Sequence, residues 1–213
     1  MTTETTPRPE LIYVGDPMCS WCWGFSPTLK AVMSRYPNRF DYSLVLGGLR
    51  PGPTAAKLDD GMKAYIAHHW QEVARRTGQA FNHAFLERDD FTYDTEPSCR
   101  AVVTARRIAK SRVFEYMESV HDAFYARNLD PTQLETFLEI AESMGLSKEE
   151  FQRLFESDEI RKETQGDFEL ARRMAVSGFP SLLLREGDSL KSLTQGWVPL
   201  EQLGQILMPW TDG

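Results

Sequence analysis

The amino-acid sequence predicts a mixed α/β protein, with a β-α-β start and a β-β-α end separated by a long helical section. Two apolar runs near the N-terminus, 11–16 and 40–49, have strand character and enclose one helical stretch. Strand character returns only at 181–185, after roughly 125 residues with helical periodicity. A strand, a helix and a strand within about forty residues predict a βαβ unit with a right-handed crossover.

The first three elements rest on local signals. The run Leu-Ile-Tyr-Val at 11–14 is followed by Gly and Asp, which favours a strand that stops there. Residues 17–36 have a helical pattern. Aromatic and branched residues at 40–49 are typical of a second strand, and Pro51-Gly52-Pro53 then breaks the chain.

The middle section is predicted to hold six helices. Apolar residues recur at helical spacing from 58 to 73, and Gly78 ends that run. Thr95 is a candidate cap for the next helix, and Ser147 with Glu150 has the spacing of a capping box. The remaining helices are expected at 113–125, from Asp130-Pro131 to Gly145, and at 158–176.

The C-terminal elements form a hairpin and a helix. The sequence Ser-Leu-Leu-Leu-Arg at 181–185 predicts a strand, and Glu-Gly-Asp at 186–188 has the composition of a hairpin turn. Residues 189–195 are the expected returning strand. The apolar spacing at 200–207 suits a closing helix.

Composition narrows the classes of partner. Apolar residues make up 41% of the 213 residues, which is enough for a substantial core. The formal net charge of −7 argues against nucleic acid or an anionic membrane as the main partner. The sequence has neither a signal-peptide pattern nor an apolar stretch that approaches the ~20 residues of a membrane span. We therefore expect a cytoplasmic protein.

Two of the three cysteines, Cys19 and Cys22, stand at the first predicted strand–helix junction. The start of a helix carries free N–H groups and a positive partial charge, so a thiol placed there ionises more easily. Residues three apart on a helix are neighbours, so the two sulfurs can meet. We expect Cys19 to be the exposed attacking thiol and Cys22 the more buried resolving thiol.

Two other interpretations of this pair stay open. Free cysteines often pack as small hydrophobic residues, so the pair could be inert. It could also be half of a structural zinc site, which needs four ligands. Cys99 is isolated, however, and His68 and His69 are adjacent, so the sequence supplies no obvious second ligand pair and we expect no metal.

The segment Asp-Pro-Met-Cys-Ser-Trp-Cys-Trp-Gly-Phe at 16–25 resembles the active-site segment of DsbA-like thioredoxin-fold proteins. It is most similar to the cytoplasmic branch of predicted protein-disulfide isomerases, which includes FrnE-type proteins. Pro27 matches a proline that kinks the corresponding thioredoxin helix. Ser-Gly-Phe-Pro-Ser at 177–181 matches the family's cis-proline loop.

The resemblance implies a thioredoxin fold interrupted by an all-helical insertion domain. The expected boundaries are 9–52 and 177–213 for the two parts of the thioredoxin-like domain and 53–176 for the insertion. Cys19 then corresponds to the nucleophile and Cys22 to the resolving cysteine. The resemblance also implies that Ser20, Trp21, Phe179 and Pro180 bind substrate. Ser20 and Trp21 form the dipeptide that tunes the redox potential in this family.

The expected function is that of a thiol–disulfide oxidoreductase, a reductase or isomerase that works through a Cys19–Cys22 redox pair. The cytosol keeps most thiols reduced, which favours reduction or isomerisation over net disulfide formation. We expect no bound cofactor beyond this redox-active disulfide, with glutathione as a candidate electron donor. The expected partners are protein or peptide disulfides and the thioredoxin or glutathione system.

Two alternatives belong to other functional classes. The first is a glutathione-dependent isomerase or transferase, similar to hydroxychromene-carboxylate isomerases and kappa-class transferases. That branch typically uses a serine near the position of Cys19 and needs no second thiol. The second is a peptide-binding domain without redox activity.

Several further residues have weaker interpretations. Cys99 is expected to be packed in the core, and Asp16 to cap the helix that carries the thiols. Trp23 and Phe25 are expected in the core, with Trp21 exposed beside the thiols. His121 lies on an apolar helix face, where packing is the expected role.

Overall fold

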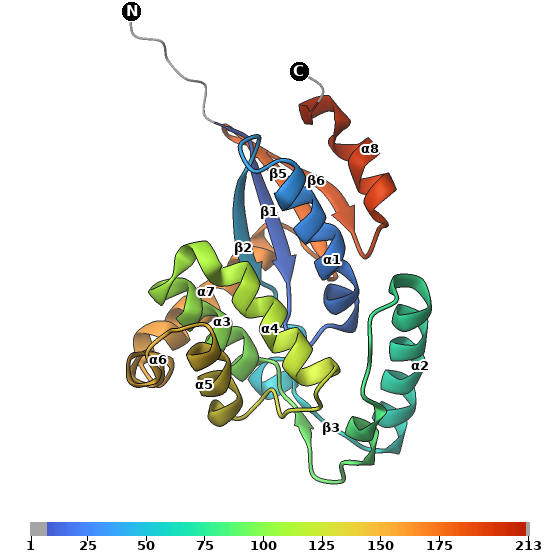
Figure 1. Cartoon of the computed structure of the whole chain (residues 1–213), viewed down its shortest axis with the longest axis vertical. Coiled ribbons are helices and arrows are strands. Elements are labelled where there is room, and N and C mark those ends of the chain that lie inside the picture. Colours follow the sequence, from blue (N-terminus) through green and yellow to red (C-terminus); the bar gives the residue numbers. More distant parts are fainter. Residues whose placement is uncertain (1–7, 212–213) are drawn as a thin grey trace, which may run out of the picture.

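A computed structural model describes residues 8–211 (Figure 1). Its central sheet has four strands in the order β2-β1-β5-β6. The parallel pair is formed by β1 (Glu10–Gly15) and β2 (Asp41–Leu46), and the antiparallel partners are β5 (Ser181–Glu186) and β6 (Ser189–Gln195). The predicted mixed α/β class is confirmed.

Eight α-helices and a small second sheet complete the described part of the chain. The helices are α1 (Ser20–Arg35), α2 (Asp60–Thr77), α3 (Glu96–Ile108), α4 (Val113–Tyr125), α5 (Leu134–Ser143), α6 (Lys148–Phe155), α7 (Asp158–Arg173) and α8 (Leu200–Thr211). The second sheet pairs β3 (Ala56–Lys57) with β4 (Thr92–Tyr93). Short 3-10 turns are η1 (Gly52–Thr54), η2 (His83–Glu87) and η3 (Lys110–Arg112).

Alternation along β1 divides the core between the two faces of the sheet. Leu11 and Tyr13 belong to the cluster that contains the buried side of α1, whereas Ile12 and Val14 pack with Ala171 of α7. The helices α1 and α7 therefore cover opposite faces of the sheet (Figure 1). β1 and α1 meet at the end of the sheet that faces the middle helical section.

Most predicted helix ends agree with the structure. Gly78 ends α2 with a left-handed φ of 76°, and the Ser147 hydroxyl accepts a hydrogen bond from the Glu150 N–H at the start of α6. The predicted start of α5 at Asp130 is wrong. The Asp130 carboxylate instead accepts bonds from the Thr132 N–H and hydroxyl, which forms a turn before the helix begins.

Two other expectations need correction. The insertion is not purely helical, because β3 and β4 pair within it. The helix expected from Pro17 begins instead at Ser20, because Pro17 and Met18 form a turn stabilised by the Asp16 carboxylate. The division of the chain into two domains stays a prediction.

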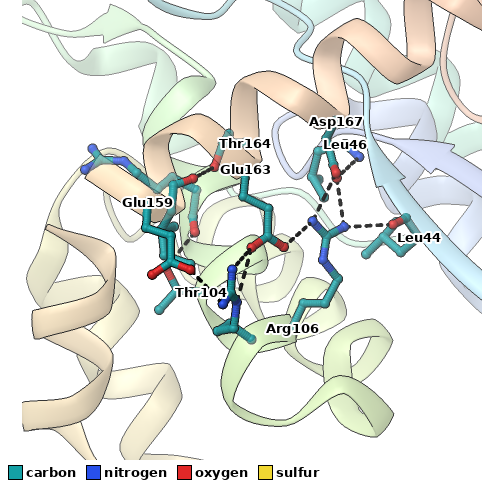
Figure 2. Close-up of polar contacts among 11 residues, drawn as sticks. Leu44, Leu46, Thr104, Arg106, Glu159, Glu163, Thr164 and Asp167 are labelled. Atoms are coloured by element: carbon teal, nitrogen blue, oxygen red, sulfur yellow. Dashed lines mark hydrogen bonds and ion pairs between the residues drawn. The ribbon is translucent and has the colours of Figure 1, made fainter. Parts of the chain in front are cut away.

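The outer edge of β2 is covered by two side chains from the middle section. The Asp167 carboxylate on α7 accepts a hydrogen bond from the Leu46 N–H at 2.9 Å. The Arg106 guanidinium on α3 donates to the Leu44 carbonyl at 3.0 Å and pairs with both Asp167 oxygens (Figure 2). These groups satisfy backbone atoms that an exposed sheet edge leaves unpaired, and they join α3 and α7 to the sheet.

Replacing Arg106 with Gln should lower the free energy of unfolding by about 2–4 kcal/mol, because it leaves a mostly buried carboxylate without its partner. Arg107 is the matched control, since it also pairs with Glu163 but its side chain is 43% exposed against 17% for Arg106. Arg107→Gln should lower the free energy of unfolding by much less. Urea unfolding of the two variants measures the difference, and equal losses would contradict this role of Arg106.

Candidate active site

Cys19 and Cys22 occupy the first turn of α1. Cys19 is the N-cap residue, with φ −93° and ψ 114°, and no side chain caps this helix start. Its carbonyl accepts the N–H groups of Cys22 and Trp23 at 2.9 and 3.1 Å. Both thiols are free. The predicted location of the two cysteines at the start of the helix is therefore confirmed.

The two thiols differ less in exposure than expected. Cys19 is 6% exposed and Cys22 is 0% exposed, so the predicted order holds but the expectation of an openly exposed Cys19 is wrong. Burial is the main cause that raises the pKa of the Cys22 thiol well above its usual value. The neighbouring side chain of Tyr13, which is buried on β1, partly opposes this rise in the pKa of Cys22.

The loop before β5 reaches the Cys19 sulfur from the other end of the sequence. The Cys19 Sγ donates to the Phe179 carbonyl at 3.7 Å. The Phe179–Pro180 peptide bond is cis. Cys19 and Phe179 are 160 residues apart in the sequence. The two motifs that carry the family resemblance therefore meet at the Cys19 sulfur.

A cleft of about 630 Å³ opens beside Cys19. It is lined by Cys19, Ser20, Trp21 and Phe179, together with residues of the loop after β2, α2 and the end of α7. Pro180 does not line it. Of the six predicted site residues, four line the cleft, and the other two, Cys22 and Pro180, are buried and do not line it.

Trp21 is half-buried rather than exposed, which corrects the expectation. Its ring lies 6.3 Å from that of Trp197, and the Arg76 guanidinium lies 5.6 Å from its centre. Trp23 and Phe25 are buried, as predicted. Trp197 follows β6, and no pattern in the sequence predicts its place beside Trp21.

The cleft depends on two glycines, Gly47 and Gly48, that fall within the predicted strand at 40–49. A Cβ atom on Gly47 would lie 2.0 Å from the Phe179 ring, so a larger residue would displace the loop beside Cys19. Gly48 has a φ of +67°, a backbone conformation that residues other than glycine rarely adopt. β2 accordingly ends at Leu46, and the chain turns past the cleft.

Asp16 does not cap α1, which corrects the prediction. It is fully buried, and its Oδ1 accepts the Met18 N–H at 2.8 Å. Its Oδ2 accepts the Leu49 N–H at 2.7 Å and the Cys99 thiol at 3.3 Å. Burial raises the pKa of this carboxyl, and the backbone bonds oppose that shift. The side chain turns inward because the loop after β2 presents an N–H that needs an acceptor.

Cys99 and His121 are both packed in the interior, as predicted. Cys99 is 0% exposed, and burial raises the pKa of its thiol. The His121 Nε2 lies 3.3 Å from the Asp16 carbonyl, and its Nδ1 has no partner among residues 8–211. Burial lowers the pKa of His121 to about 4, so the ring is neutral at pH 7. His121 and Tyr13 also line a second cavity of about 520 Å³ beside α1 and α4.

Residues 8–211 contain neither a metal-ligand cluster nor a membrane-spanning helix. No three or more His, Cys, Asp or Glu side chains there gather as metal ligands would. No helix there has the length and apolar character needed to cross a bilayer.

Comparison with known protein families decides the family. The profile of the DSBA-like thioredoxin domain matches residues 10–207. The chain belongs to this family. Its fold is the thioredoxin fold of DsbA-like proteins, with helices between the two parts of the sheet.

Solved structures agree with this membership. A candidate protein disulfide isomerase from Nitrosomonas europaea is 34% identical, with a TM-score of 0.90, over 97% of this chain and 98% of that chain. The cytosolic disulfide reductase DsbM from Pseudomonas aeruginosa is 25% identical, with a TM-score of 0.74, over 87% and 89% of the two chains. It has also been solved with GSH.

The ClpXP adapter protein SpxH of Bacillus subtilis is 24% identical over 174 residues. That match covers 81% of this chain. The chain spans only 57% of the length of that relative.

The buried imidazole of His121 should make stability depend on pH. Its folded-state pKa of about 4 lies below its ordinary value of 6.5, so the unfolded chain binds this proton first as the pH falls. The free energy of unfolding therefore keeps its full value above pH 6.5. It falls by about 3 kcal/mol in total as the pH drops from 6.5 toward 4. Urea unfolding at several pH values should give a flatter profile for His121→Gln than for the unmodified chain. Parallel profiles would contradict a buried neutral His121.

Proposed function

We propose that this protein is a thiol–disulfide oxidoreductase that reduces or isomerises substrate disulfides, with Cys19 as the nucleophile and Cys22 as the resolving thiol. The observation that carries the proposal is the position of Cys19. Its sulfur stands at the N-cap of α1, at the edge of the cleft, and Cys22 lies one turn further in. Thiolates at helix starts are the reactive form of cysteine in thiol exchange.

Reduction proceeds in two exchanges. The Cys19 thiolate attacks one sulfur of the substrate disulfide, which forms a mixed disulfide and releases the other substrate sulfur as a thiolate. Cys22 then loses its proton and attacks the Cys19 Sγ. This forms the Cys19–Cys22 disulfide and releases the second substrate sulfur, so the substrate gains two electrons and the enzyme is oxidised. An external thiol or dithiol returns the enzyme to its reduced form.

The residues around Cys19 have distinct roles in this proposal. The Phe179 backbone, next to Pro180, would pair with an extended substrate segment beside the reacting sulfur. Ser20 and Trp21 would contact the substrate from the cleft wall, and the half-buried indole of Trp21 offers an apolar surface. The burial of Cys22 keeps this thiol from reacting with solvent reagents before Cys19 forms a mixed disulfide.

We further propose that the enzyme works in the cytoplasm and is reduced there by glutathione or thioredoxin. The similarity to a cytosolic disulfide reductase, itself solved with GSH, supports this proposal. The retained second thiol favours the two-cysteine route over a glutathione transferase or isomerase, which needs no partner for the first sulfur. It equally favours redox chemistry over peptide binding alone.

A disulfide reductase assay on a protein substrate tests the proposal. Cys19→Ser should reduce the rate to the uncatalysed level, because no other thiol lines the cleft among the described residues. Cys99→Ser is the matched control, since serine keeps a donor for Asp16 and Cys99 lies outside the cleft. Its rate should stay close to that of the unmodified enzyme. Unchanged turnover in Cys19→Ser would refute the proposed function.

A further inference from the structure

The cleft beside Cys19 differs in charge from the protein as a whole. The chain has a formal net charge of −7 and contains 31 acidic residues. Within residues 8–211, no aspartate or glutamate lines the cleft, whereas Arg50 and Arg172 do. Arg50 follows β2, and Arg172 lies in the last turn of α7. The cleft is thus locally cationic on an acidic protein.

Neither of these guanidinium groups is neutralised by the protein. In the described part of the chain, no carboxylate forms an ion pair with Arg50 or Arg172. Arg50 instead contacts the Met62 sulfur at 3.2 Å and lies 5.8 Å from the centre of the Tyr65 ring. These contacts orient the Arg50 side chain and leave its charge available.

The other polar groups at the cleft do not cancel this charge. The start of α1 adds a positive partial charge at Cys19. His69, also in the cleft wall, has a lowered pKa because of burial and the neighbouring His68, so it is neutral at pH 7. The Asp16 carboxyl is fully buried and bonded to the Met18 and Leu49 N–H groups.

We propose that this cleft selects small disulfides that carry carboxylates near the S–S bond, with Arg50 and Arg172 as the residues that determine this preference. The proposal rests on the proposed function and specifies its substrate class. A volume of about 630 Å³ is within the range of clefts that enclose small molecules. Guanidinium groups are suited to bind carboxylates, because their planar donors match the two oxygens.

A charge series of small disulfides tests the preference without a recycling system. The reduced enzyme is mixed with the dianion dithiobis(nitrobenzoate), with neutral dithiodipyridine, or with dicationic cystamine, and the rate constant of its oxidation is measured. The ratio of the anionic to the neutral rate is compared between variants, so the intrinsic reactivity of each reagent cancels. Arg50→Gln and Arg172→Gln should each lower this ratio about fivefold.

Controls separate charge from structure. Arg173→Gln removes a neighbouring exposed charge that does not line the cleft, and it should leave the ratio unchanged. Arg50→Lys keeps the charge and should retain most of the preference. The rate with cystamine should rise in the Gln variants. Added salt should lower the ratio in the unmodified enzyme more than in the double variant.

The outcomes distinguish this inference from the function on which it rests. If the Gln variants react with all three reagents as the unmodified enzyme does, the charge preference is refuted and the oxidoreductase proposal stands. Equal rate losses with all three reagents would also refute it, because they indicate a structural effect. If none of the reagents oxidises the Cys19–Cys22 pair of the unmodified enzyme, the proposed function itself fails.

Discussion

The buried Asp16 is the constraint on which the arrangement around Cys19 depends. Its carboxylate joins the turn before α1, the loop after β2 and Cys99 on α3 through three hydrogen bonds. Its carbonyl accepts the Cys19 N–H at 3.1 Å and contacts the His121 ring. Hydrogen bonds to a charged group typically contribute about 1.5–3 kcal/mol each, which helps to offset the burial of the carboxylate. One residue therefore holds the turn before α1 and the loop after β2, both of which line the cleft, in place beside Cys19.

The two faces of α1 have separate surroundings. On one side, the start of the helix faces the cationic cleft, which the buried Cys19 helps to line. On the other side, buried Cys22 lies against Tyr13, and the nearby cavity also reaches the neutral His121. In the proposed mechanism, this division would separate the attacking sulfur of Cys19 from the sulfur of Cys22, which stays protonated until the mixed disulfide has formed. A buried thiol with a raised pKa fits that order of events.

The sequence predicted what local patterns encode. The strand–helix order, the position of the thiol pair at the start of α1 and the caps at Gly78 and Ser147 all follow from short-range signals. The loop before β5 was recognised only because its motif resembles a known family. These features need no knowledge of which distant segments meet.

The predictions that were wrong or missing concern residues whose contacts lie in distant segments of the sequence. Asp16 looked like a helix cap because its partners, Leu49 and Cys99, lie 33 and 83 residues away. Trp197 and the edge contact of Arg106 with β2 were missed for the same reason, since neither has a periodic or local signature. The exposure of Cys19 was overestimated because the Phe179 loop that covers it arrives from the other end of the chain.

The most direct test of the account uses the Cys22→Ser variant with a protein disulfide substrate, followed by peptide mapping of the covalent adduct. Without the resolving thiol, the account predicts a long-lived mixed disulfide on Cys19 and none on Cys99. The double variant that also carries Cys19→Ser should form no adduct. An adduct on Cys99, or no adduct on Cys19 while the substrate is still reduced, would contradict the assignment of Cys19 as the attacking sulfur.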